Sequence, residues 1–76
     1  MRPLEKKVLV TFETTTSAMA FEEEAKKAGL NGRLIPVPKQ ITAGCGLSYC
    51  APVREKDRTR QLAEKMIHQR IYELMI

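Results

Sequence analysis

The centre of the chain reads RLIPVPKQITAGCGLSYC from Arg33 to Cys50. Its first five residues are apolar and branched for the most part, and they predict a β-strand. Because Pro36 and Pro38 have no backbone N–H to donate, we expect this strand to lie at a sheet edge or to end early. A loop that reaches Gly46 follows, and Leu47 to Val53 predicts the next strand.

Upstream of this stretch, the pattern predicts a strand and then a helix. Residues 7–12 alternate, with Val8, Val10 and Phe12 on one face of a strand. Small and aromatic apolar residues then recur at helical spacing, which predicts a helix from about Thr16 to Ala28. The hydroxyl residues before it are candidate N-caps, and Gly29 is a natural C-cap.

The C-terminal third predicts a second helix and one ambiguous segment. Glu55 or Asp57 could cap this helix. Its expected apolar face consists of Leu62, Ala63, Met66 and Ile67. Residues 70–76 could extend the helix or form a strand with alternate apolar residues on one face. Their β-branched residues and short apolar ending favour the strand.

The predicted order of elements is therefore β-α-β-β-α with a closing β. Short chains with this order usually form an α+β, ferredoxin-like sandwich, in which an antiparallel sheet carries two helices on one face. The 76 residues are enough for a single domain spanning 1–76, with a thin core.

Composition and charge exclude several classes of protein. No apolar run reaches the roughly 18 residues of a transmembrane helix, and we recognise no signal peptide, so a cytoplasmic protein is expected. The net charge of +4 is scattered and the chain has few aromatic residues, which does not indicate a nucleic-acid-binding protein. Two cysteines and one histidine are too few for a closed zinc site, so neither metal nor cofactor is expected within one chain.

Cys45 is the candidate functional residue. Gly44 and Gly46 flank it, and glycine on both sides frees the backbone to present the thiol to a partner. In a right-handed β-α-β unit, the loops after the first two strands emerge at one end of the sheet. A helix N-terminus there would stabilise a thiolate or bind a small anion, helped by the hydroxyls of Thr14, Thr15 and Thr16. Alternatively, the cysteine is incidental to a flexible turn and the hydroxyls only cap the helix.

Cys50 offers a second thiol. In an extended strand, five residues separate it from Cys45 by roughly 16 Å, whereas a disulfide requires Cα atoms within about 7 Å. The odd spacing also directs the two side chains to opposite faces. We therefore interpret Cys50 as a buried or half-buried hydrophobic residue, with a resolving-thiol role as the alternative.

Several of these segments together resemble the Se/S (selenium/sulfur) carrier protein-like family of small bacterial and archaeal proteins. The matching segments are Phe12 through Ala18-Met19, then Gly29, Arg33-Leu34-Ile35-Pro36-Val37-Pro38 and Gly44-Cys45-Gly46-Leu47. The resemblance implies that Cys45 carries reduced sulfur or selenium as a persulfide or perselenide, in a loop shaped by Gly44 and Gly46. The chain departs from the family pattern at Ser17 and at Cys50, and the second departure leaves a two-thiol chemistry open.

The leading hypothesis is thus a carrier rather than a stand-alone enzyme. Its partners would be a cysteine desulfurase-like donor and an acceptor enzyme, and an exposed sheet edge would permit a homodimer. Three alternatives remain: a small-anion-binding or regulatory module, a Cys45/Cys50 thiol-disulfide redox protein, and a metal carrier that pairs Cys45 across a dimer.

Overall fold

The structure, a computed structural model, describes residues 4–41, 44 and 46–76. The elements follow the predicted order, and residues 70–75 form the closing strand. They are β1 (Lys6–Thr11), α1 (Thr15–Lys27), β2 (Arg33–Pro36), β3 (Leu47–Pro52), a 3-10 turn η1 (Val53–Glu55), α2 (Lys56–Lys65) and β4 (Arg70–Met75).

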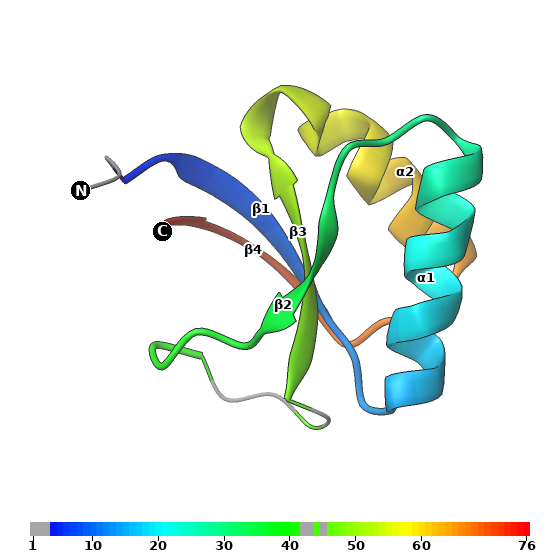
Figure 1. The fold of residues 1–76 in the computed structure, drawn as a ribbon, viewed down its shortest axis with the longest axis horizontal. Coiled ribbons are helices and arrows are strands. Elements are labelled where there is room, and N and C mark those ends of the chain that lie inside the picture. The colour runs from blue at the N-terminus through cyan, green and yellow to red at the C-terminus, as the bar shows by residue number, and fades with distance from the viewer. Residues whose placement is uncertain (1–3, 42–43, 45) are drawn as a thin grey trace.

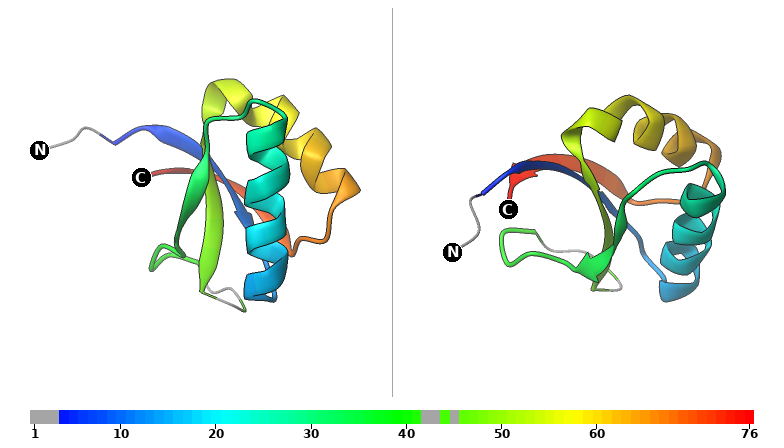
Figure 2. Two further views of the ribbon diagram at one scale, coloured as in Figure 1. Left: turned by 45° about the vertical axis from the view of Figure 1, so that its right-hand side comes forward. Right: turned by 45° about the horizontal axis from the view of Figure 1, so that its top comes forward.

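The four strands form one antiparallel sheet in the order β2-β3-β1-β4. Both helices lie on the same face of this sheet, and none of the described residues forms a helix on the other face (Figure 1, Figure 2). α1 packs on β2 and β3, and α2 packs on β1 and β3. This is the predicted α+β, ferredoxin-like arrangement. Since β1 and β2 are both antiparallel to β3, they run parallel to each other and end at the same end of the sheet.

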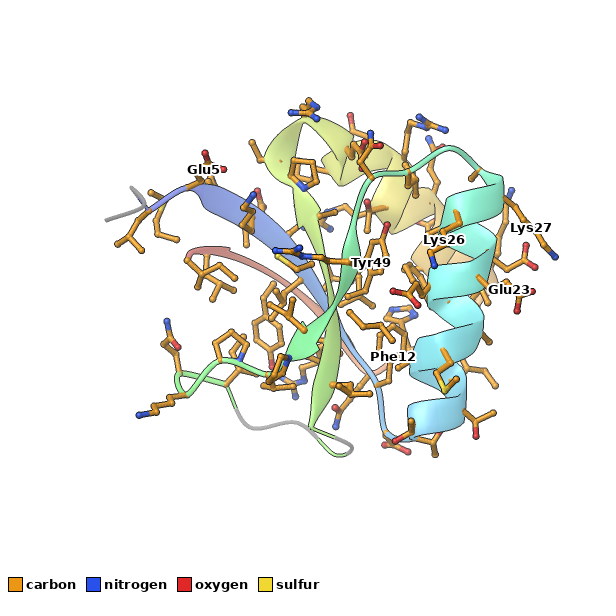
Figure 3. The ribbon with its side chains drawn as sticks, in the orientation of Figure 1. Glu5, Phe12, Glu23, Lys26, Lys27 and Tyr49 are labelled. Atoms are coloured by element: carbon orange, nitrogen blue, oxygen red, sulfur yellow. The ribbon has the colours of Figure 1, made fainter. Side chains whose placement is uncertain are left out.

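The hydrophobic core lies between the sheet and the helices. Phe12, Phe21 and Tyr49 are fully buried in it, and Figure 3 shows Phe12 and Tyr49 between the strands and α1. The Phe21 ring contacts both others, with centroid distances of 5.4 Å to Phe12 and 5.0 Å to Tyr49. The Phe21 and Tyr49 rings pack edge to face, and the Phe12 ring is tilted against Phe21. Such arrangements add to the stabilisation from apolar burial.

The ends of α1 follow from the residues predicted to cap it. Thr14 is the N-cap, and its Oγ1 accepts a hydrogen bond from the Ser17 N–H at 3.1 Å. Beyond the helix, Gly29 has a φ of +80°, a conformation that glycine adopts without a Cβ clash and that ends helices. The predicted and observed boundaries of this helix differ by one residue at each end.

The strand β2 is short and lies at the sheet edge, as its prolines predict. Its Leu34 N–H donates to Glu22 Oε2 at 3.3 Å. Glu22 begins a run of three glutamates on α1, and its carboxylate satisfies a donor of the edge strand. A carboxylate acceptor makes this a charge-assisted bond.

The second helix differs from the prediction in two details. Glu55 occupies its N-cap position but makes no cap hydrogen bond with its side chain. Instead, the Glu55 carboxylate accepts from the Asn31 backbone N–H at 2.9 Å and from the Asn31 side-chain amide at 2.7 Å. Ile67, expected on the apolar face, is 79% exposed because α2 ends at Lys65.

We predict that Tyr49→Phe lowers the free energy of unfolding by about 0.5–1.5 kcal/mol at neutral pH. The Tyr49 hydroxyl accepts a hydrogen bond from the Gly32 N–H at 3.1 Å, and the variant loses this bond while keeping the ring. Burial also raises the pKa of Tyr49 above its ordinary value of 10.0. Above pH 10 the unfolded chain would therefore ionise first, so stability falls as the pH rises.

Urea unfolding at pH 7 and pH 11 measures both effects. The variant should lose less stability at high pH than the wild type does, and Tyr72→Phe on the outer strand β4 is the matched control. An unchanged pH dependence in Tyr49→Phe would contradict the assignment.

Candidate functional site

The candidate site lies in the loop between β2 and β3, at the end of the sheet where β1 leads into α1 (Figure 1). The predicted carrier residue, Cys45, lies outside the described residues, as do Thr42 and Ala43. The site is therefore built from the two glycines on either side of Cys45 and from the residues that they contact.

Gly44 packs against the segment that follows β1. A Cβ added to Gly44 would lie 3.1 Å from Glu13 Cα and 3.3 Å from the Glu13 carbonyl oxygen. The Gly44 N–H also donates to Gln69 Oε1 at 3.5 Å, a long contact from the segment before β4. Gly44, next to Cys45 in the sequence, thus contacts Glu13, the residue that precedes the α1 N-cap Thr14. For Gly44, the topological prediction that these two loops meet is confirmed.

At the other end of the loop, glycine is favoured at position 46 by its backbone conformation and not by a close contact. Its φ is +80°, and an added Cβ would meet no atom within 4 Å. Its carbonyl oxygen accepts from the Val37 N–H at 2.9 Å, one residue beyond the β2–β3 pairing of Pro36 with Leu47. Gly44 is therefore required for close contact, whereas Gly46 is required for its backbone conformation.

Pro36 and Pro38 fix the backbone at the start of this loop. Pro36 is the last residue of β2, where its missing N–H costs no hydrogen bond to β3. The Pro38 carbonyl accepts from the Ile41 N–H at 3.0 Å, which forms a turn. The loop thus begins with a fixed direction immediately after the edge strand.

The predicted hydroxyl residues begin α1. The Thr14 hydroxyl is used within the helix cap, because it donates to Ser17 Oγ at 2.9 Å and accepts from the Ser17 N–H. Thr15 and Thr16 are exposed, and the first turn contains no acidic residue. The partial positive charge of the helix end is therefore not offset within that turn. A direct role of these hydroxyls in holding an anion stays a prediction.

Cys50 lies elsewhere, in the middle of β3. Its free thiol is half-buried, and its neighbours in the sheet are Leu9 on β1 and Arg33 on β2. Burial raises the pKa of this thiol above 9.0, although the charges of Lys7 and Arg33 act in the opposite direction. At neutral pH it is therefore largely protonated, which is typical of a structural cysteine. The predicted half-buried position is confirmed.

The sequence matches the family described as "Putative Se/S carrier protein-like" over residues 7–73. The chain belongs to this family. The matched range contains β2, β3, Cys45 and Cys50, so the resemblance noted from the sequence is confirmed. Comparisons with curated proteins and with solved structures found no match. The family description points to a carrier, and a carrier interacts with other proteins.

Two further observations apply to the described part of the chain. None of its helices combines the length and the apolar character that crossing a membrane requires. No three side chains of His, Cys, Asp or Glu within it gather where they could hold a metal ion.

Sequence analysis did not identify Glu13 and Gln69 as neighbours of the candidate site. The position of Gln69 could have been inferred from the predicted topology, since a closing strand antiparallel to β1 must begin beside the end of β1. Gln69 precedes such a strand, and its N–H donates to the Thr11 carbonyl at 2.7 Å.

We predict different consequences for alanine at the two glycines. Gly46→Ala should lower the free energy of unfolding by about 1 kcal/mol, because alanine is strained at positive φ, and Gly46→Asn should lower it less. Gly44→Ala should displace the Glu13 backbone, because the atoms that its Cβ would meet are backbone atoms and not the end of a flexible side chain. Urea unfolding and the amide NMR shift of Glu13 separate the two effects. A large Glu13 shift in Gly46→Ala, or none in Gly44→Ala, would refute this distinction.

Proposed function

We propose that the protein is a thiol carrier for reduced sulfur or selenium, with Cys45 as the carrier residue. The observation that carries the proposal is the packing of Gly44 against Glu13, directly before the N-cap of α1. A helix N-terminus lowers the pKa of a nearby thiol and stabilises the anionic form. A persulfide is also an anion, so the same environment favours the loaded carrier.

The proposed transfer is an exchange at sulfur. The Cys45 thiolate attacks the terminal sulfur of a donor persulfide, a new S–S bond forms, and the donor leaves as a thiolate. The product is a persulfide on Cys45, with no net oxidation or reduction. Delivery is the same step in reverse toward an acceptor thiolate. Selenium would follow the same path as a perselenide.

The proposed partners are a cysteine desulfurase-like donor and an acceptor enzyme in the cytoplasm. The net charge of +4 would steer the carrier toward acidic surfaces on such partners. Docking at the loop end of the sheet would leave the helix-covered core undisturbed.

A second copy of the chain is a further proposed partner. The strand β4 is an edge of the sheet, and Met75 on it is 51% exposed. An uncovered edge offers N–H and C=O groups for strand pairing. Light scattering after size exclusion should then give about twice the monomer mass of 8.6 kDa, and a monomer mass at all concentrations would refute the dimer.

The carrier hypothesis predicts a sulfur adduct on a single cysteine. After incubation with a cysteine desulfurase and cysteine, the intact mass should increase by one sulfur atom, and a reductant should remove it. Cys50→Ser should retain the adduct, because the Cys50 thiol is half-buried and largely protonated. Cys45→Ser should lose it.

The same experiment distinguishes the alternatives. An adduct that Cys50→Ser abolishes would assign the chemistry to the wrong thiol and refute the proposal. A loss of two hydrogens in the wild type without an adduct would indicate a Cys45–Cys50 redox pair. No mass change at all would favour the small-anion-binding module, in which Cys45→Ser leaves binding intact.

A further inference from the structure

A groove of about 520 Å³ lies on the face of the sheet that carries no helix, and the proposed carrier chemistry does not use it. Its polar lining includes Glu5, Lys7, Arg33, Arg54 and the Cys50 thiol, and its apolar lining includes Ile35 and Pro52. These residues come from β1, β2, β3 and the turn after β3. In Figures 1 and 2 this face lies on the side away from both helices.

The register of the strands places the groove residues next to one another. Arg33 and Leu9 flank Cys50 from the two neighbouring strands, and Lys7 pairs with Pro52. Side chains alternate along a strand, so Leu9 lies on the face opposite Val8 and Val10. Leu9 is nevertheless fully buried. Leu9 therefore lies beneath the surface, and the apolar lining of the groove comes from Leu4, Ile35, Pro52 and Ile76. Apolar lining with a few polar groups is typical of ligand-binding grooves.

The charges around this groove do not cancel. Lys7 Nζ lies 3.0 Å from Glu5 Oε2, which offsets one cation. Among the described residues, no carboxylate lies within 4.0 Å of the guanidinium of Arg33 or Arg54. Two arginines thus line one groove with no ion-pair partner in the described part of the chain. The guanidinium fork matches carboxylate and phosphate oxygens.

We propose that this groove binds a small organic anion, a carboxylate or phosphate group on an apolar body. Arg33 and Arg54 hold the anionic group, and the apolar part lies against Ile35, Pro52 and the Cys50 side chain. The charge of the two arginines favours an anionic group over a neutral one, and the apolar lining favours an apolar body. The site is separate from the loop that carries Cys45, so its test does not depend on the carrier function.

Cys50 provides a built-in reporter of the groove. In a Cys45→Ser background it is the sole cysteine, since the chain has two. We would compare its alkylation by iodoacetate, an anion, with alkylation by neutral iodoacetamide at low salt. The ratio of the iodoacetate rate constant to the iodoacetamide rate constant does not depend on the fraction of Cys50 that is ionised, because the same thiolate attacks both reagents.

Relative to N-acetylcysteine amide, this ratio should rise about three- to tenfold through attraction to the arginines. It should fall toward the model-compound value in high salt. Arg33→Gln and Arg54→Gln should each reduce it. Lys65→Gln, which removes the same charge from the exposed end of α2, should leave it unchanged.

Binding itself is tested by protection of Cys50. Hexanoate and hexyl phosphate should slow alkylation by iodoacetamide, whereas 1-hexanol should not, and the two arginine variants should abolish the protection. Comparing the two anions shows which head group the site prefers. An unchanged ratio, or a raised ratio without protection by either anion, would overturn the proposal. Circular dichroism of each variant checks that it is folded.

Discussion

The burial of β1 on both of its faces is the constraint on which the rest of the structure depends. Val8, Leu9 and Val10 are consecutive and all fully buried. A strand whose alternate faces are both apolar must be covered on both sides. The helices cover one side, and the side chains of the helix-free face cover the other. β1 pairs with both β3 and β4, so its position also fixes where the remaining strands lie.

Cys50 and the two glycines beside Cys45 lie in different chemical environments. Cys50 lies in the sheet, where the register of β1 and β2 determines its neighbours and burial raises its pKa. The glycines beside Cys45 belong to a loop that contacts the end of β1 and the segment before β4. Cys50 is therefore held within the sheet, whereas Gly44 and Gly46 lie in a connecting loop. The carrier and groove proposals assign these two places separate roles.

Local signals in the sequence predicted most of the fold. Prolines at 36 and 38 placed β2 at an edge, and Thr14 and Gly29 marked the limits of α1. Alternation identified β1, and β-branched residues with a short apolar ending favoured β4. These signals depend on neighbouring residues only. The family resemblance, which rested on the same segments, was confirmed over residues 7–73.

Contacts between distant residues could not be predicted in this way. Glu22 and Glu55 had the charge of solvated or capping residues, yet each satisfies a backbone N–H of the segment around β2. Arg33 and Arg54 are 21 positions apart in the sequence, and only the hairpin of β2 and β3 brings them to one groove. Ile67 fitted a helical period that the chain does not continue, since α2 stops before it.

The Glu55 carboxylate has a mechanical consequence. It fastens the segment before β2 to the start of α2, at the end of the sheet opposite the loop with Gly44. At the other end of the sheet, Thr11 accepts hydrogen bonds from the Gln69 and Arg70 N–H groups, so the β-α-β halves are joined at both ends by bonds that do not involve the loop with Gly44. Substitutions in that loop can therefore change the surface at this end of the sheet while the bonds that join the two halves stay in place.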